Sequence, residues 1–452
     1  MKKTLKRVGL LLLSAGVVLG IIFFTQYPKL TVISGYAAKD MASQVFLAGR
    51  DPESVRDNDL QVPLISLSEA QVDGEHRAAS ASVFGLQSRT AVYRQGLGSV
   101  LLPKGTALPE KAPSPKRVMT PSPLPYPMGQ AAPADSIIPG VDYGQLRKGI
   151  DQAFRDPEIQ RTRTVMVLYK GHLVGERYVE GFGPDTPVLG WSMTKSVLAT
   201  VYGILEYQGK IELETPAPVP SWQGDERKGI TFDHLLRMQS GLAWDEDYSG
   251  LSDVTRMLFL EADMAANQAE KSLAGPPGSL WNYSSGTSNL LSGLLRQQFT
   301  TYQDYLDFPY REFIDRIGMH SMVLETDFSG SFVGSSYGWA STRDWGRFGL
   351  LYLRRGDWFG DRLFDTDWVD YVTRPTPGSG SRYGAHFWLN ADRGFPDVPE
   401  DMFMANGHQG QHVFIIPSRE LVVVRTGLAE GPDFDANAFL REVLAAFPGA
   451  QP

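Results

Sequence analysis

Hydrophobic and polar positions follow strand-like patterns near both ends of the larger part of this chain. Residues 164–181 read TVMVLYKGHLVGERYVEG, which predicts two strands joined across Lys170, Gly171 and His172. Residues 412–428, HVFIIPSRELVVVRTGL, predict a second hairpin that turns at 417–419. These two hairpins lie far apart in the sequence, and the chain between them carries helical patterns. We therefore expect one antiparallel sheet assembled from both ends of this part.

Helical patterns flank and separate the predicted strands. Apolar residues recur at helical spacing over 143–154 and over 434–447, and residues 190–210 read as a third helix that is apolar on almost every side. The middle of the chain, 211–355, is mostly helix and loop. The predicted class is therefore α/β of the α+β type, with an antiparallel sheet flanked by helices and a mostly helical region beside it.

The N-terminus combines a basic head with an apolar run. MKKTLKR precedes residues 8–24, an uncharged stretch slightly shorter than the ~20 residues of a usual membrane-spanning helix. No small-x-small cleavage site follows directly, so we expect a retained single-pass anchor in a bacterial inner membrane, with the rest of the chain in the periplasm. The later stretch SGYAAKD leaves cleavage and secretion as the alternative.

Composition shifts divide the rest of the chain. After the head and anchor, 1–24, residues 25–100 form an N-terminal appendage, in which 81–102 predict a β-hairpin or two. Residues 101–140 are dense in proline and read either as an extended linker or as a chain wrapped over a surface. Residues 141–452 form the compact domain.

Charge and cysteine content exclude several kinds of chemistry. The 452 residues carry a net charge of −8 without a basic footprint, which argues against a nucleic-acid partner. There is no cysteine, so thiol catalysis, disulfides and cysteine-bound metals are excluded.

The stretch GWSMTKS supplies the first candidate for chemistry. In a helix, Ser192 and Lys195 lie one turn apart on the same face, so a desolvated lysine could accept the serine proton. The N–H of Ser192 would lie at the positive end of the helix, where an oxyanion is stabilised. A plain N-cap serine is the alternative, because Ser-x-x-Lys also occurs by chance.

Two loops supply further candidates. Tyr283 lies in a Gly/Ser/Pro-rich loop before a helix and could shuttle a proton if a cation lowered its pKa from about 10. His408 and two glycines precede an apolar strand, and glycines let backbone approach a substrate. His408 and His412 are unsuited to zinc, since four strand residues separate them by roughly 13 Å. We therefore expect neither a metal nor a cofactor.

Together these stretches resemble the serine β-lactamase and penicillin-binding-protein superfamily. SMTK, then YSS about ninety residues later, then HQG about 125 residues after that match its Ser-x-x-Lys, Tyr-x-Asn and Lys-Thr-Gly or His-x-Gly motifs in order and spacing. The intervening phrases at 231–242, 337–356 and 417–428 agree, and the resemblance covers about 141 to the C-terminus. It looks closest to the branch of 6-aminohexanoate-dimer hydrolases and class C-like esterases.

The resemblance implies a role for each matching residue. Ser192 matches the acylated nucleophile, Lys195 its base and Tyr283 the proton shuttle. The N–H groups of Ser192 and Gln411 match the oxyanion hole. Substrate-binding positions would be Ser285 and the third-motif residues His408 and Gly410, and the loop residues Trp244 and Tyr248 would line the pocket.

Two departures from the superfamily pattern guide the choice of substrate. Ser285 stands in place of an asparagine and His408 in place of a lysine, which weakens the anchor for a carboxylate. We therefore expect a serine hydrolase that cleaves a small ester or amide. A D,D-peptidase or β-lactamase, and a non-catalytic membrane-anchored binding or sensor protein, remain the alternatives.

Overall fold

The computed structural model describes residue 14 and residues 26–108, 113–133 and 137–449. The apolar run 8–24 therefore lies outside the described residues except for Ser14. Within the described ranges, no helix has both the length and the apolar character needed to cross a bilayer. The expected transmembrane helix thus stays a prediction.

A six-stranded antiparallel sheet joins the two ends of the larger domain. Its order is β12-β13-β14-β15-β5-β6, and β15 pairs with β5 along their whole length. The strands are β5 (Thr162–Tyr169), β6 (His172–Tyr178), β12 (Trp388–Leu389), β13 (Phe403–Gly407), β14 (Gln411–Ile416) and β15 (Leu421–Gly427). This confirms the prediction of an antiparallel sheet assembled from both ends of the domain.

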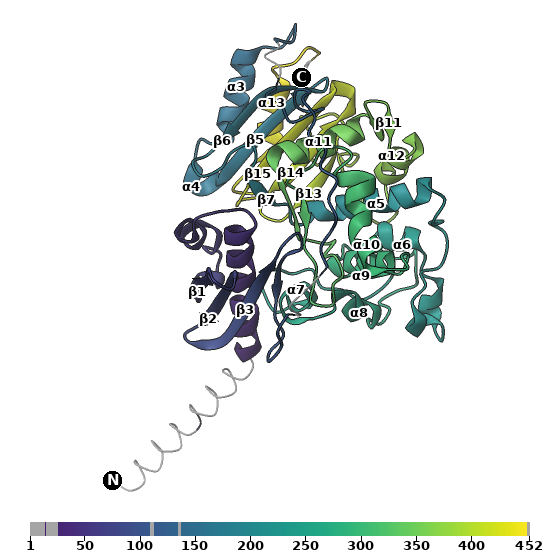
Figure 1. The fold of residues 1–452 in the computed structure, drawn as a ribbon. Coiled ribbons are helices and arrows are strands. Elements are labelled where there is room, and N and C mark those ends of the chain that lie inside the picture. Colours follow the sequence, from purple (N-terminus) through teal and green to yellow (C-terminus); the bar gives the residue numbers. More distant parts are fainter. Residues whose placement is uncertain (1–13, 15–25, 109–112, 134–136, 450–452) are drawn as a thin grey trace.

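Helices cover both faces of this sheet, which explains why its central strands are apolar throughout. Every residue of β5, β14 and β15 is buried. On one face α3 (Tyr143–Gln152) packs against α13 (Ala436–Leu444) and β6. On the other face α11 (Thr342–Leu353) contacts β5, β14 and β15. Figure 1 shows the resulting layers.

A mostly helical region lies beside the sheet and surrounds α5 (Met193–Tyr207). The short helix α4 (Pro157–Gln160) precedes β5 and the turn η6 (Pro417–Arg419) joins β14 to β15, so both lie at the sheet. The other elements of the helical region are η3 (Pro220–Trp222), η4 (Glu226–Gly229), α6 (Phe232–Leu236), α7 (Asp253–Leu260), α8 (Met264–Ala269), α9 (Ser285–Arg296), α10 (Tyr302–Pro309), η5 (Tyr310–Ile314) and α12 (Thr366–Thr373). Short strands complete it: β7 (Pro187–Leu189), β8 (Val323–Leu324), β9 (Gly338–Ser341), β10 (Asp357–Trp358) and β11 (Asp361–Arg362).

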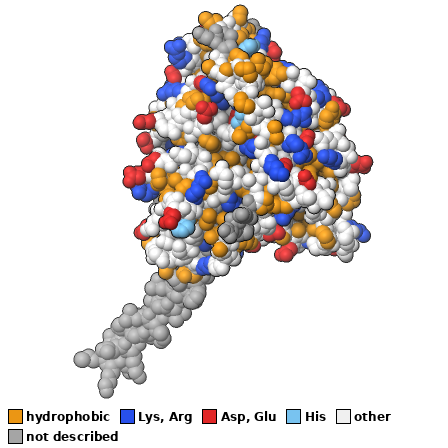
Figure 2. Space-filling model, viewed as in Figure 1, with side chains coloured by type: hydrophobic (Ala, Val, Ile, Leu, Met, Phe, Trp, Pro, Cys, Tyr) orange, Lys and Arg blue, Asp and Glu red, His pale blue; other side chains and the backbone are white. Residues whose placement is uncertain are grey.

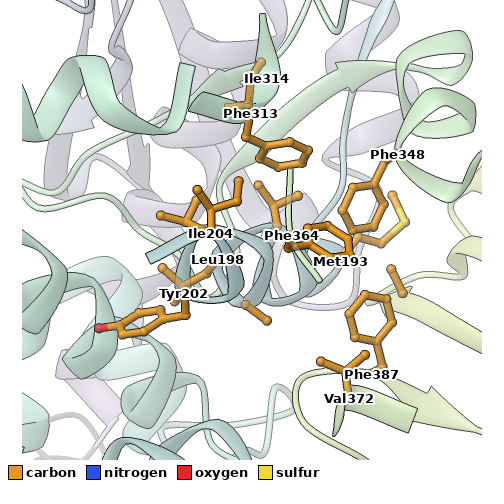
Figure 3. Packing of buried hydrophobic residues seen from close by; sticks show 14 of the residues in the cluster. Met193, Leu198, Tyr202, Ile204, Phe313, Ile314, Phe348, Phe364, Val372 and Phe387 are labelled. Carbon is orange, nitrogen blue, oxygen red and sulfur yellow. The ribbon is translucent and has the colours of Figure 1, made fainter. Parts of the chain in front are cut away.

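Helix α5 is the centre of the largest apolar core. Its residues from Met193 to Leu205 are all buried. Figure 3 shows Met193 and Ile204 of this helix among aromatic side chains such as Phe348 and Phe387. A helix enclosed on all sides holds its N-terminus in a fixed place, and that end carries Ser192.

The N-terminal part forms a separate lobe, which lies below the six-stranded sheet in Figure 1. A helix over residues 26–46 packs on a four-stranded antiparallel meander, β1-β2-β3-β4. The elements after the helix are α2 (Pro52–Ser54), η1 (Val55–Asp59), η2 (Ile65–Leu67), β1 (Ser68–Asp73), β2 (Ala78–Val83), β3 (Leu86–Arg94) and β4 (Gly98–Leu101). The sequence predicted a hairpin or two, whereas β1 was missed because SEAQVD is polar and only half-buried.

The proline-dense segment lies on the surface of the larger domain. Arg117 forms an ion pair with Asp315 at 2.6 Å, and the buried Tyr126 donates its hydroxyl to the carbonyl of Arg343 at 2.8 Å. Arg347 donates to the carbonyls of residues 127 and 129. The described parts of this segment are therefore held along the domain. Over the face shown in Figure 2, acidic and basic side chains are interspersed.

Candidate active site

Ser192 lies on a sharp turn between β7 and α5. The residue before it, Trp191, is buried and has a φ of +46°, the left-handed region that a tryptophan rarely occupies. Ser192 occupies the N-cap position of α5, yet its side chain makes no capping hydrogen bond. An N-cap role therefore does not explain the position of the serine hydroxyl. The strained turn directs this hydroxyl away from the N–H groups of the helix.

Two glycines let this turn approach the sheet. A Cβ on Gly190 would lie 2.4 Å from Cζ2 of Trp345, and a Cβ on Gly407 would lie 2.1 Å from the carbonyl oxygen of Gly190. Such contacts are too short for any side chain, so both positions require glycine. The end of β13 and the start of β14, where Gln411 lies, thereby come beside the Ser192 turn.

Lys195 lies one helical turn after Ser192 and makes three hydrogen bonds. Its Nζ is 3.0 Å from Oγ of Ser192, 2.9 Å from Oγ of Ser285 and 3.0 Å from the carbonyl oxygen of Ser335. The structure thus brings together the residues of the first two predicted motifs, which are 90 positions apart in the sequence.

Burial is the main influence on the pKa of Lys195. The side chain is 1% exposed, and its desolvation lowers the pKa to about 8, against the opposing effect of the Glu246 carboxylate. A lysine with this pKa is neutral in a substantial fraction of molecules at mildly alkaline pH. The sequence predicted such a desolvated lysine from the apolar helix around it.

Glu246 belongs to the site, and the sequence analysis missed it. Its Oε1 accepts a hydrogen bond from Oγ of Ser285 at 2.5 Å, and its Oε2 accepts one from the backbone N–H of Ser285 at 2.8 Å. The indole N–H of Trp244 also donates to Oε2. Glu246 lies in the acidic loop after α6, where most carboxylates are solvated, and its partner is 39 residues away. No local pattern distinguishes it from its acidic neighbours.

Tyr283 completes the cluster. Its ring lies against Tyr383 and Trp388, with centroids at 5.7 and 5.3 Å, and Nζ of Lys195 lies 4.8 Å from its ring centroid. Burial, helped by the charge of Glu246, raises the pKa of Tyr283, although a hydrogen bond with Ser192 opposes the rise. The idea that a cation lowers the pKa of this tyrosine is therefore wrong, because desolvation and the charge of Glu246 raise this pKa and only hydrogen bonds oppose them. The phenol stays protonated and acts as a hydrogen-bond donor.

Ser285 and Trp244 have different places from those expected of substrate contacts. Ser285 is fully buried, and its hydroxyl is occupied by Lys195 on one side and Glu246 on the other. Trp244 is 9% exposed and holds Glu246 through its indole N–H. In the structure Ser285 thus contacts the lysine and Trp244 supports the carboxylate behind it, while direct contact of either residue with a substrate stays a prediction.

His408 and Tyr248 form a stacked pair beside the nucleophile. Their ring centroids are 4.9 Å apart with an interplanar angle of 14°, and Trp191 meets the His408 ring edge-on at 5.5 Å. Nδ1 of His408 lies 3.4 Å from Oε1 of Glu430, whose pKa is lowered chiefly by that contact. The third predicted motif therefore reaches the same site as the other two.

Gly410 and Gln411 occupy the turn between β13 and β14. A Cβ on Gly410 would lie 2.2 Å from the carbonyl oxygen of Ala429, and its φ is +75°. The turn itself therefore requires this glycine, whether or not substrate passes beside it. The side chain of Gln411 is buried and donates to the carbonyl of Gly427 at 2.6 Å, so only its backbone N–H is available for an oxyanion hole.

The described residues contain no cluster of three or more His, Cys, Asp or Glu side chains that could hold a metal. His412 is buried in β14, and desolvation lowers its pKa to about 3. Its ring stacks on Phe414 at 4.8 Å. The His408 and His412 pair is therefore split between a site residue and a core residue.

Comparison with known proteins agrees with this geometry. The sequence matches the Beta-lactamase family over residues 151–446. It is 24% identical over 338 residues to a 6-aminohexanoate-dimer hydrolase of Paenarthrobacter ureafaciens, covering 68% of this chain and 82% of that protein. Similar folds include EstCE1, described as a hydrolase with promiscuous acyltransferase activity, with a TM-score of 0.54 and 13% identity over 67% of this chain and 98% of that one. A D-stereospecific amidohydrolase from Streptomyces sp. has a TM-score of 0.51 and 15% identity over 69% and 100%.

Proposed function

Since the chain belongs to the beta-lactamase family, we propose that it cleaves a small ester or amide through an acyl-enzyme formed on Ser192. It is a serine hydrolase of this superfamily, and the proposal concerns its nucleophile, base and substrate. Lys195 is the base, Tyr283 is the proton donor, and the N–H groups of Ser192 and Gln411 form the oxyanion hole.

One observation carries the proposal: the hydrogen bonds around Lys195 leave only one place for a lone pair. A carbonyl oxygen only accepts, so Lys195 must donate to Ser335. A carboxylate also only accepts, so Ser285 must give its hydroxyl hydrogen to Glu246 and accept one from Lys195. A neutral amine has two hydrogens and one lone pair, and both hydrogens are then committed. The lone pair is directed at Oγ of Ser192, as a general base requires.

The reaction follows from these positions. Oγ of Ser192 bonds to the substrate carbonyl carbon while its proton passes to Nζ of Lys195. The positive end of α5 and the two N–H groups stabilise the negative oxygen that results. The bond to the leaving alcohol or amine then breaks, and the leaving group takes a proton that Tyr283 relays from the lysine. Water then attacks the acyl carbonyl carbon while its proton passes to Nζ of Lys195. The bond between this carbon and Oγ of Ser192 breaks, Oγ takes the proton, and the carboxylic acid leaves.

The surroundings of His408 favour a neutral substrate. In place of a permanently charged lysine, this position has an imidazole that stacks on Tyr248 and has the carboxylate of Glu430 at 3.4 Å. A nearby negative charge disfavours the binding of a substrate carboxylate. This supports an ester or small amide without a carboxylate over a β-lactam or a peptidoglycan stem peptide.

The location remains part of the proposal. The basic head and the apolar run 8–24 support an inner-membrane anchor with the catalytic domain in the periplasm. Fractionation of cells tests this: the full-length protein should stay in the membrane pellet after a salt wash. Recovery as a shortened soluble form would instead indicate secretion after cleavage.

Hydrolysis of p-nitrophenyl acetate, the 6-aminohexanoate dimer and nitrocefin by the full-length protein in detergent tests the activity. Ser192→Ala should lower kcat/KM for the ester and the dimer by about 1,000-fold or more, as loss of a nucleophile does. Ser66→Ala, at an exposed serine outside the hydrogen-bond cluster, is the matched control and should retain activity. Hydrolysis that survives Ser192→Ala would remove the proposed nucleophile, and turnover of nitrocefin alone would favour a β-lactamase.

A further inference from the structure

A cavity of about 490 Å³ lies between the N-terminal lobe and the loop that follows Trp244. One wall comes from the helix 26–46 and the loop 62–65, and the other from residues 247–251, α7 and His408. Apolar side chains from both walls dominate its interior, among them Val32, Ile33, Leu64, Leu251 and Phe259. Its volume is within the range of small-molecule sites in proteins.

The stacked pair of Tyr248 and His408 connects this cavity with the residue next to the nucleophile. Both residues line the cavity. On the other side, Trp191, the neighbour of the nucleophile, meets both rings edge-on at 6.2 and 5.5 Å. The charge of Glu246 also acts on the Tyr248 hydroxyl. A substrate that occupies the cavity would therefore extend from the reacting serine past this pair.

The N-terminal wall is firmly held. Lys39 and Glu325 form a buried ion pair at 2.5 Å, and Arg89 donates to the carbonyl of Phe259 at 2.7 Å. Phe259 itself lines the cavity, so the lobe is fastened to the domain at the cavity wall. This wall lies outside residues 151–446, the part that matches the family. It is an addition of this chain to the shared fold.

Leu64 gives a second indication that the cavity is functional. It has a φ of +70° and is 49% exposed, so an aliphatic side chain is held in a strained conformation at the edge of the cavity. Such strain persists only where the surroundings impose it, and it concentrates at ligand sites.

We propose that this cavity binds an unbranched aliphatic chain of the substrate, attached to the carbonyl that Ser192 attacks. The inference rests on the proposed hydrolase activity and names the class of its substrate. Each methylene that leaves water for an apolar site stabilises the complex by an amount that corresponds to about a fourfold gain in binding. Selectivity for long chains over short ones should therefore rise steeply with chain length.

The experiment compares p-nitrophenyl acetate, butyrate and octanoate with the full-length protein, each below its micelle-forming concentration. The expected result is a kcat/KM for octanoate at least about tenfold above that for acetate. Ser249→Trp fills the cavity from an exposed position on one wall, and Val62→Asp introduces a charge from the opposite wall. Each should lower the octanoate-to-acetate ratio at least about tenfold.

Ser66→Trp is the matched control, because Ser66 is exposed in the same lobe and does not line the cavity. It should leave the ratio unchanged. An equal kcat/KM for acetate and octanoate, or a ratio that neither cavity variant lowers, overturns the inference while Ser192-dependent acetate hydrolysis leaves the proposed function standing. If no ester is hydrolysed in a Ser192-dependent way, the proposed function itself fails.

Discussion

At the scale of single residues, the charge of Lys195 is the result of two opposing effects. Desolvation lowers the pKa to about 8, while the carboxylate of Glu246, one hydroxyl away, raises it. Burial prevails because the lysine is almost fully enclosed. The amine is therefore neutral above about pH 8 and protonated below, and only the neutral form can accept the Ser192 proton.

The first prediction is a pH profile that follows from the loss of the Lys195 proton above about pH 8. For an ester substrate, the rate constant of acylation should rise as pH increases through about 8 and then level, because Lys195 loses its proton there. Pre-steady-state release of p-nitrophenol over pH 6 to 10 measures it. A rate independent of pH across this range would contradict lysine as the base.

The second prediction concerns Glu246→Gln. Removing the negative charge removes the effect that raises the Lys195 pKa, so the limb of the profile should move to lower pH. Acylation at high pH should also slow by roughly tenfold. The amide of a glutamine can donate a hydrogen bond to Oγ of Ser285, so the Ser285 hydroxyl is no longer held in the direction of residue 246. Asp245→Asn, at the exposed neighbouring carboxylate, is the control and should change neither the pH of the limb nor the rate of acylation. A purely structural role for Glu246 would reduce the rate without moving the limb.

The residues that sequence alone could identify are those with a motif. Ser192, Lys195, Tyr283 and His408 follow known motifs at the right spacing, and the structure brings all four together. Glu246 could not be found this way, since its importance depends on the fold that brings Ser285 to it. The same holds for the pKa of Tyr283, which depends on burial among aromatic rings.

At the scale of elements, the position of Ser192 depends on how α5 is enclosed. Gly203 in this helix faces Trp368, and a Cβ there would lie 2.4 Å from Cε2 of the indole. Alanine in place of glycine within a helix usually stabilises by up to about 1 kcal/mol. Here the clash outweighs that gain, because the tryptophan is buried and cannot move away.

The third prediction is therefore that Gly203→Ala lowers the free energy of unfolding by about 1–3 kcal/mol. Urea denaturation followed by tryptophan fluorescence measures the change. Gly224→Ala is the control, because a Cβ at Gly224 meets nothing within 4 Å and the residue has an ordinary φ. Its stability should stay within about 0.5 kcal/mol of the unsubstituted protein. A Gly203→Ala variant that is more stable would show that α5 can shift.

The elements that were predicted well from the sequence have a clear hydrophobic periodicity and are bounded by residues typical of turns. Lys170 and Gly171 both have positive φ, as the tight turn between β5 and β6 requires, and the runs on either side of that turn are these two strands. β1 gave no such signal, since its residues are half-buried or exposed and it gains order from pairing with β2. Pairing with a neighbouring strand, not local preference, decides elements of this kind.

At the scale of the whole molecule, a buried ion pair joins the N-terminal lobe to the family domain. Lys39 and Glu325 are 5% and 0% exposed, and they lie 286 positions apart in the sequence. Glu325 also accepts hydrogen bonds from the backbone N–H of Ser99 and the indole of Trp339, so both parts of the molecule meet at one carboxylate. No sequence pattern indicates this ion pair, because an isolated lysine and glutamate are normally solvated.

The fourth prediction is that Lys39→Met destabilises the protein by about 3 kcal/mol or more, because it leaves the Glu325 charge buried without its cation. The double variant Lys39→Met with Glu325→Gln should recover most of the loss. No charge then remains buried, and the amide oxygen can accept from the N–H of Ser99, although the indole of Trp339, which donates to the other carboxylate oxygen, loses its acceptor. Urea midpoints for the two single variants and the double variant give the coupling energy.

The same variants connect the lobe to catalysis. If the lobe supplies a wall of the aliphatic cavity, Lys39→Met should also lower the octanoate-to-acetate ratio, because weaker docking lets the helix 26–46 move away from α7. The double variant should restore the ratio together with the stability. Recovery of stability without recovery of the ratio would show that the cavity depends on Lys39 itself. An unchanged urea midpoint for Lys39→Met would mean that the apolar contacts between Tyr36 and Phe259, at 5.4 Å, hold the lobe without the ion pair.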